Sequence, residues 1–310
     1  ATQGHTFAQN NLGWLYENGH GVDQDYCEAV LRYKIAAEQG HVRAQNNLGR
    51  MYYRGEGVEQ DFAEAARWYK MAATQGDAGT QFFLGAMYFK GEGVEQDFAE
   101  AARWYKMAAE QGHAEAQYNL GRMYYRGMGV EQDFAEAARW YKMAAEQAAE
   151  QGDAEAQYNL GLMYCNGQGI EQDFSEAVRW WRLAAEQEHA EAQYNLGVMH
   201  ERGLGVEQDF AEAVQWWKMA AEQGDADAQH NLGAMYASGR GVVQDFAEAV
   251  QWFQMAAAQG HAEAMEKLLK MQQEVDGIKR IAEQGDAEAQ CNLGVMYSQG
   301  LGVEQDFAEA

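Results

Sequence analysis

Glycine-rich loops are the feature of this sequence that most invites a chemical interpretation. The pattern Gly-x-Gly-Val followed by Asp-Phe recurs along the chain, as in "GMGVEQDFAEA", which begins at Gly127. Backbone N–H groups of such loops can bind phosphate where a helix begins. These loops lack the third glycine of a dinucleotide fingerprint and the lysine of a P-loop. An aspartate caps each following helix and would repel phosphate, so the pattern predicts turns rather than nucleotide sites.

Residues with hydrolytic or metal-binding chemistry are few and scattered. The serines lie outside any Ser-x-x-Lys or Gly-x-Ser-x-Gly context, and they are Ser175, Ser238 and Ser298. Four histidines precede a helix where other repeats carry aspartate, and they are His41, His113, His189 and His261. Interchange with aspartate indicates a cap or loop position. No histidine and glutamate have metal-ligand spacing on one helix face. The sequence therefore predicts no catalytic residue, no cofactor and no metal ligand.

The cysteines do not form a disulfide framework. Cys27, Cys165 and Cys291 fall at three different places in the repeated pattern, and an odd number without a recurring spacing is typical of free thiols. We expect these thiols to be buried or partly buried, because free cysteine behaves as a small apolar residue. Cysteine usage leaves the compartment open.

The charge balance limits the classes of partner. The formal net charge is −25 and the isoelectric point is about 4.6. Such a surface favours solubility and repels phosphate backbones and anionic lipids, so nucleic acid and membranes are disfavoured partners. No apolar stretch approaches the roughly 20 residues that span a bilayer.

The two ends of the sequence resemble the inside of an array. The chain opens on "ATQGH", like the end of a repeat, and closes on "DFAEA", the first turn of a helix. We expect a piece of a longer array, in which no targeting segment is visible. The bacterial cytoplasm, the periplasm and secretion all stay open, as does the oligomeric state.

Internal repetition sets the architecture. A Leu-Gly pair marks each copy, at Leu12, Leu48, Leu84, Leu120, Leu160, Leu196, Leu232 and Leu293, and most successive pairs are 36 residues apart. That period is near that of two-helix solenoid repeats. The sequence predicts a single array over residues 1–310. Its regular repeats lie at about 6–41, 42–77, 78–113, 114–153, 154–189, 190–225 and 226–261, followed by a shortened repeat at 262–286 and a truncated one at 287–310.

One copy shows how each repeat should fold. In "AEAQYNLGRMYY", residues 114–125, apolar side chains recur at helical spacing, and Gly121 predicts a notch where a neighbouring helix comes close. The loop glycines then turn the chain. Asp133 and Glu136 predict a capping box for a second helix, whose aromatic side, including Trp140, should be buried. Because one hairpin cannot bury its own apolar face, the copies should stack into an all-α, right-handed α-solenoid superhelix.

Three places depart from the regular pattern. The stretch "AAEQAAEQG", residues 144–152, duplicates four residues, and we expect its helix to continue through Ala148 and Ala149 because only good helix formers are present. The stretch 262–286 has lost its glycine loop. Both changes should bend or offset the superhelix. Glu188 stands where other repeats end a helix with glycine, and a left-handed conformation there would store roughly 1 kcal/mol.

The combined pattern resembles the Sel-1-like repeat (SLR) family, a relative of the tetratricopeptide repeat. The resemblance rests on Leu-Gly, Met-Tyr, Gly-x-Gly-Val, Asp-Phe-x-x-Ala and Trp-x-x-x-Ala-Ala, and it covers essentially the whole chain. It implies a solenoid that acts as an adaptor or scaffold in protein complexes. A cysteine-rich bacterial branch linked to penicillin binding carries paired cysteines in every repeat, and this chain does not. The chain also lacks the proline that often follows Gly-x-Gly-Val, so we expect a less rigid loop.

Four positions of the first helix vary between copies while its core positions stay constant. They are the residue two before Leu-Gly, the residue after it, and the two residues before the loop glycine. By analogy with tetratricopeptide arrays, they face a concave groove. In repeats two to four, and at single places beyond, they carry aromatic and basic residues, a composition typical of interface anchors. The candidate partner-binding residues are Arg50, Tyr53, Arg54, Phe82, Phe89, Lys90, Tyr118, Arg122, Tyr125, Arg126, Tyr158, Tyr194 and Arg202.

Two interpretations of these residues stay open. Either they bind a partner, or the basic residues pair with the abundant glutamates of neighbouring repeats. On the first interpretation, the groove binds a protein or peptide segment with acidic and apolar side chains, with arginines forking onto carboxylates. The alternatives to such a non-catalytic scaffold are a hydrolase or penicillin-binding-type enzyme, and a module for glycan or cell-wall peptide.

Overall fold

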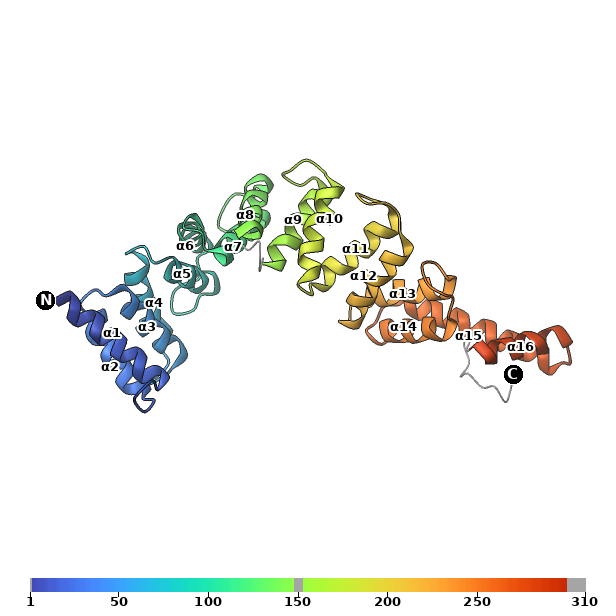
Figure 1. Cartoon of the computed structure of the whole chain (residues 1–310), viewed down its shortest axis with the longest axis horizontal. Coiled ribbons are helices and arrows are strands. Elements are labelled where there is room, and N and C mark those ends of the chain that lie inside the picture. The colour runs from blue at the N-terminus through green and yellow to red at the C-terminus, as the bar shows by residue number, and fades with distance from the viewer. Residues whose placement is uncertain (1, 148–152, 300–310) are drawn as a thin grey trace. The chain divides into compact units, whose positions relative to one another are not determined.

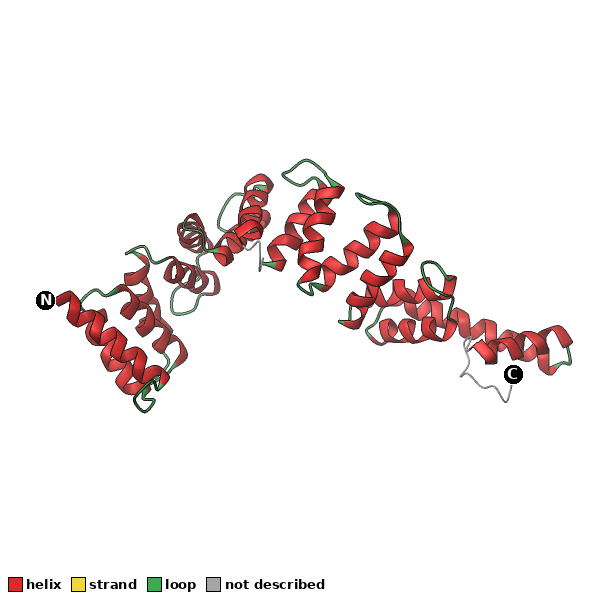
Figure 2. Cartoon of the chain, viewed as in Figure 1, coloured by secondary structure: helices red, strands yellow, loops and turns green. Residues whose placement is uncertain are grey.

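The computed structural model describes residues 2–147 and 153–299, and within them the chain forms sixteen helices and no strand (Figures 1 and 2). The helices are α1 (Thr2–Asn18), α2 (Tyr26–Ala37), α3 (Val42–Arg54), α4 (Phe62–Ala73), α5 (Ala78–Lys90), α6 (Phe98–Glu110), α7 (Ala114–Arg126), α8 (Phe134–Gln147), α9 (Ala154–Asn166), α10 (Phe174–Glu186), α11 (Ala190–Arg202), α12 (Phe210–Glu222), α13 (Ala226–Ser238), α14 (Phe246–Ala258), α15 (Ala262–Glu283) and α16 (Ala287–Gln299). None of these helices is both long and apolar enough to cross a membrane.

Consecutive helices pack on one another as hairpins, which confirms the prediction of an all-α solenoid fold. The chain divides into two compact units, residues 1–156 with 168–170, and residues 157–167 with 171–310. In the first unit each helix from α1 to α8 contacts the next, and in the second unit the same holds from α10 to α16. The bend and handedness of a superhelix over the whole chain stay predictions.

The glycine inside the first helix of each hairpin is a packing notch, as the sequence predicted. A Cβ atom placed on Gly121 would lie 2.8 Å from Cδ1 of Tyr141, a residue of α8. The neighbouring Leu120 and Met123 are both 1% exposed, so this face of α7 lies in the core. A side chain larger than hydrogen would separate the two helices, which explains why an unfavourable helix former recurs here.

The second loop glycine allows two repeats to touch backbone to backbone. Gly129 has φ of 69°, and a Cβ atom there would lie 2.2 Å from the carbonyl oxygen of Phe98 in the preceding hairpin. The loop is held further by Gln132, whose amide Nε2 donates to the carbonyl of Tyr125 at 2.8 Å. These contacts give the Gly-x-Gly pattern a structural role and agree with its interpretation as a turn.

The predicted capping box forms only in half. Asp61 accepts from the backbone N–H groups of Ala63 and Glu64, at 2.9 and 3.0 Å. The N–H of Asp61 itself donates to the carbonyl of Tyr52 at 3.0 Å, so it is already satisfied by the preceding helix. The Glu64 carboxylate instead accepts from Arg67 at 2.9 Å. The expectation that this glutamate reaches back to the cap was therefore wrong for this repeat.

The histidines that alternate with aspartate are helix caps, as predicted. Nδ1 of His41 accepts the backbone N–H of Ala44 at 3.2 Å, and His113, His189 and His261 make the same contact at their own helices. Glu188 adopts φ of 65°, so the left-handed conformation considered for it is present, and it is the one non-glycine residue with positive φ in the described part of the chain.

Buried glutamines tie successive hairpins together, a feature that the sequence reading missed. Gln45 is 1% exposed, and its Nε2 donates to the carbonyl of Ala37 in the preceding hairpin at 3.1 Å. Its Oε1 accepts from Gln75, in the turn that follows α4, at 2.8 Å. The pattern recurs at Gln81 with Gln111. A side-chain relay thus joins the end of one hairpin, the first helix of the next, and the turn that follows its second helix.

The departures from regularity have different outcomes. Helix α8 is described to Gln147, and the expected continuation through Ala148 and Ala149 lies outside the described residues. The stretch that lost its glycine loop folds as one helix of 22 residues, α15.

The cysteines are free thiols, but Cys27 and Cys291 are exposed, so the expectation of burial was wrong for them. Neither side chain occupies a core position of its helix.

The tryptophan stripe lies largely in the core, as predicted. At the place that Trp140 holds in its repeat, four tryptophans are 5% exposed or less, namely Trp68, Trp104, Trp140 and Trp180. Trp216 and Trp252, in the second unit, are only partly buried.

Candidate binding groove

A pocket of ≈ 430 Å³ lies in the first compact unit where the first helices of three successive hairpins meet. Its walls come from α3, α5 and α7, and Tyr69 and Tyr105 from α4 and α6 complete its lining. Seven of the thirteen candidate residues line it: Arg50, Tyr53, Arg54, Phe82, Phe89, Lys90 and Arg122. The variable positions of repeats two to four therefore converge on one cavity.

Phenylalanine rings form the apolar part of this pocket. The ring of Phe82 stacks on His113 with centroids 4.7 Å apart, and Phe89 packs edge-on against Phe98 at 5.2 Å. Phe83 also lines the pocket and is 47% exposed. We missed Phe83 in the sequence, although a signal was present: the other regular repeats carry asparagine at this place, directly before Leu-Gly.

Arg50 is already bound to a carboxylate of its own chain. Its Nη2 donates to both carboxylate oxygens of Glu17, at 2.6 and 2.8 Å. Glu17 belongs to α1, is 9% exposed, and also accepts from the hydroxyl of Tyr33 at 2.6 Å. Burial, followed by this hydrogen bond, raises the pKa of Tyr33. The Arg50 site is a closed network of three side chains.

The basic residues at the rim make looser pairs. Arg54 lies 3.7 Å from Glu56, and Lys90 lies 3.7 Å from Glu92. Both basic side chains are 56% exposed, and exposed pairs of this kind contribute little to stability. Glu92 also accepts from the hydroxyl of Tyr53 at 2.7 Å, and that hydrogen bond is the main cause of a raised pKa for Tyr53.

Arg122 is a basic residue of the pocket with no carboxylate at ion-pair distance among residues 2–147 and 153–299. Its guanidinium lies over the ring of Tyr118, 5.7 Å from the centroid, and its side chain is partly exposed. The hydroxyl of Tyr118 is 3.4 Å from Oε2 of Glu155. A planar cation held on an aromatic face, whose N–H donors have no carboxylate partner in the described part of the chain, can bind a carboxylate through two parallel hydrogen bonds.

The remaining candidates lie outside this pocket. Arg126 is exposed at the end of α7, and Tyr125 donates its hydroxyl to Oε1 of Gln168 at 3.1 Å. Tyr158, Tyr194 and Arg202 belong to the second compact unit. Tyr158 stacks on His189 at 4.6 Å, Tyr194 packs against the core around Trp217, and Arg202 is exposed.

The second unit has a pocket of its own, of ≈ 480 Å³, between α13, α14 and α15. Arg240, Lys267 and Lys270 line it together with Phe246 and Phe253. The sequence reading missed this pocket, because its basic residues on α15 lie in the repeat that lost its loop. The two pockets share a combination of basic and aromatic side chains.

Comparison with known proteins agrees with this architecture. A family model described as Sel1 repeat matches residues 6–41, 42–77, 78–113, 114–153, 154–189, 190–225, 226–261 and 287–310. A protective antigen present in uropathogenic Escherichia coli strains, whose crystal structure displays an SLR fold, is 38% identical with a TM-score of 0.83, over 100% of this chain and 68% of that chain. A Sel1 repeat protein from Oxalobacter formigenes is 37% identical with a TM-score of 0.66, over 86% of this chain and 75% of that chain. No curated protein matches significantly.

Proposed function

This chain belongs to the Sel1 repeat family, and on that premise we propose that it is a non-catalytic scaffold that binds a protein or peptide segment in the groove of repeats two to four. The segment carries acidic and apolar side chains. The observation that carries the proposal is Arg122, a guanidinium placed on an aromatic ring beside an apolar pocket, in a chain whose net charge is −25.

Comparison of repeats explains why Arg122 needs a carboxylate from outside. Arg50 and Arg122 occupy the same place in their repeats, directly after Leu-Gly. Glu17, the partner of Arg50, lies 33 residues before it, and the residue 33 positions before Arg122 is Phe89. The repeat that precedes Arg122 thus offers an aromatic ring where the earlier one offers a carboxylate. A partner carboxylate would complete at Arg122 the pairing that Glu17 provides at Arg50.

The apolar lining supports the second half of the proposal. Phe82, Phe83 and Phe89 present ring surface in the same cavity as Arg122. Aromatic and arginine side chains together are enriched among residues that dominate binding energy at interfaces. Acidic segments are repelled by the negative charge over most of the chain, so charge repulsion narrows their binding to basic pockets such as this groove.

A peptide-binding measurement tests this function. Fluorescence anisotropy would follow a labelled peptide of alternating glutamate and leucine, with glutamine–leucine and lysine–leucine peptides as controls. We expect the acidic peptide to bind, the basic one not to bind, and Arg122→Gln to weaken binding by roughly tenfold or more. Arg67→Gln is the matched control, because Arg67 pairs with Glu64 on an exposed helix face outside the pocket.

Salt dependence separates this function from sugar or cell-wall binding. Contacts between exposed charges weaken as salt rises, because the Debye length shortens from about 10 Å at 0.1 M to about 3 Å at 1 M. Binding that survives 1 M salt, requires the phenylalanines and is unchanged in Arg122→Gln would contradict the acidic-segment proposal and favour aromatic stacking on a neutral ligand.

A further inference from the structure

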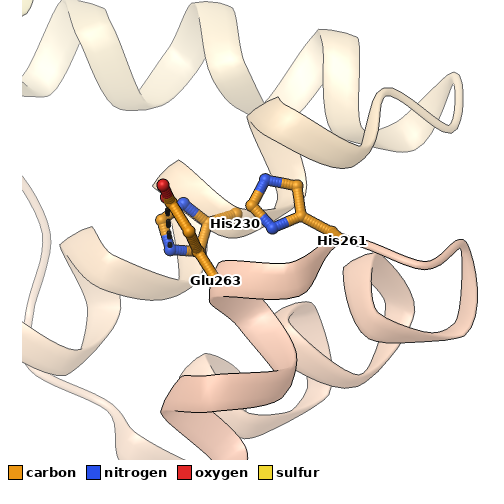
Figure 3. A group of neighbouring side chains, drawn as sticks. All are labelled: His230, His261 and Glu263. Atoms are coloured by element: carbon orange, nitrogen blue, oxygen red, sulfur yellow. Dashed lines mark ion pairs between the residues drawn. The ribbon is translucent and has the colours of Figure 1, made fainter.

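Two histidines lie next to each other in the second compact unit, with a glutamate beside them (Figure 3). His230 is on α13, His261 caps the N-terminus of α15, and Glu263 follows in the first turn of that helix. The two rings are stacked with centroids 4.7 Å apart and planes inclined by 17°. One ligand atom from each of the three residues lies within 4.8 Å of the others.

The same place in other repeats shows what is unusual here. Phe82 stacks on His113 at 4.7 Å, and Tyr158 stacks on His189 at 4.6 Å. The stacking of an aromatic ring on the next cap histidine is therefore part of the repeat. At His230 the aromatic ring is itself an imidazole, so a packing contact becomes a pair of metal-binding groups.

The surroundings of His230 favour a bound cation. Nε2 of His230 is buried and has no hydrogen-bond partner among the described residues. Oε2 of Glu263 lies 4.0 Å from that nitrogen. Two carboxylates, from Glu263 and Asp227, outweigh the single ammonium of Lys267 near this cluster.

His261 makes two contacts, and a metal ion would replace one of them. Its Nδ1 accepts the N–H of Ala264 at 3.2 Å, and its Nε2 lies 3.1 Å from Oδ1 of Asp227. The acceptor role of Nδ1 puts the ring proton on Nε2, which then donates to Asp227. A carboxylate that holds the second nitrogen of a metal-binding histidine is the usual outer-sphere arrangement, and ligation through Nδ1 would preserve it.

We propose that His230, His261 and Glu263 form a zinc site. Two imidazole nitrogens and one carboxylate oxygen are a ligand set that Zn²⁺ accepts, with water at the fourth position. The Glu263 side chain is 76% exposed and can rotate toward the rings as the ligands draw together. The site is independent of the groove in the first unit.

Isothermal titration of the untagged full chain with zinc chloride at pH 7.5 tests the proposal. We expect one site per chain, and a loss of affinity of roughly 100-fold or more in His230→Tyr, because one of three ligands is removed. Another repeat carries a tyrosine, Tyr158, at the position of His230. The variant should therefore keep the ring stack and fold. His41→Asp is the matched control, since it removes a cap histidine elsewhere and should bind zinc as the unaltered chain does.

A gain of binding gives a second, independent readout. Tyr158→His would place an imidazole against His189, whose Nδ1 lies 3.3 Å from Glu191, the residue that corresponds to Glu263 in its repeat. We expect this variant to bind two zinc ions per chain. Absence of zinc binding by the unaltered chain, equal binding by His230→Tyr, or a stoichiometry that stays at one in Tyr158→His would each overturn the assignment.

Discussion

Arg50 and Arg122 occupy the same place in two repeats of the first compact unit. Arg50 has a carboxylate partner within the chain, whereas Arg122 has none among the described residues. Arg50 binds the buried carboxylate of Glu17 through two hydrogen bonds, and Tyr33 completes the network. Arg122 lies on Tyr118 and faces a pocket that Phe89 helps to line. The scaffold is the same at both sites. On the proposed function, a single residue of the preceding repeat decides whether the arginine stabilises the fold or binds a partner.

Removing the internal carboxylate should have the largest effect. Glu17→Ala leaves Arg50 and the Tyr33 hydroxyl without their acceptor, and we expect the free energy of unfolding to fall by about 3 kcal/mol. The partial exposure of Arg50, 33% of its side chain, keeps the loss below that of a fully buried pair. Urea denaturation followed by circular dichroism would measure it.

The control for this prediction is Glu56→Ala, which removes the exposed pair with Arg54. Exposed pairs contribute about 0–1 kcal/mol, so we expect a small change. Equal losses in the two variants would show that Glu17 and Arg50 are no more coupled than residues on the surface.

Closing the open site should have the next largest effect. Phe89→Glu supplies the carboxylate that the preceding repeat lacks, and we expect an intramolecular pair with Arg122 and a loss of affinity for the acidic peptide of at least tenfold, or about 1.4 kcal/mol. Phe89→Gln removes the same ring without adding charge and is the matched control. If both variants lose affinity equally, the ring rather than the free guanidinium dominates binding.

The pH dependence of a helix cap should have the smallest effect. His41 caps α3, the helix that carries Arg50, and burial together with the nearby Arg43 lowers its pKa below 6.5. As pH falls through 6.5 toward that lower value, the unfolded chain takes up a proton before the folded chain does, so stability falls. We expect a loss of up to about 1 kcal/mol, the contribution of one cap.

His41→Asp isolates this contribution, because aspartate caps the equivalent helix α5 through Asp77. Unfolding free energies measured at pH 7.5 and pH 5.5 should differ less in this variant than in the unaltered chain. A pH dependence that is unchanged by the substitution would assign the effect to other groups.

Much of the fold could be predicted from the sequence because the same local patterns of caps, turns and buried residues recur in each repeat. The caps at Asp61 and His41, the notch at Gly121 and the left-handed Glu188 each depend on a few neighbouring residues. The back half of the capping box failed because the N–H of Asp61 bonds to Tyr52, nine residues earlier, across the loop. The relay through Gln45 also needs Ala37 from α2 and Gln75 from the turn after α4, so no single stretch reveals it.

The sequence predicted many of the residues that line the candidate site, but not which of them bind other side chains of the same chain. The variable positions identified seven residues that line one pocket. They did not reveal that Arg50 is occupied, because Glu17 lies in another repeat and becomes a neighbour only through stacking. The contact between His230 and His261 was missed for the same reason: the two residues belong to different repeats.

A double-mutant cycle between Arg122 and a partner carboxylate would test the central claim most directly. The acidic peptide and a version with its central glutamate replaced by glutamine would each be titrated against the unaltered chain and Arg122→Gln. We predict a coupling energy of about 1.5 kcal/mol or more. Either single change already breaks the bidentate guanidinium–carboxylate pair, so the second change removes little more binding energy. A coupling energy near zero, with both single changes weakening binding independently, would contradict the claim that Arg122 is an open carboxylate site.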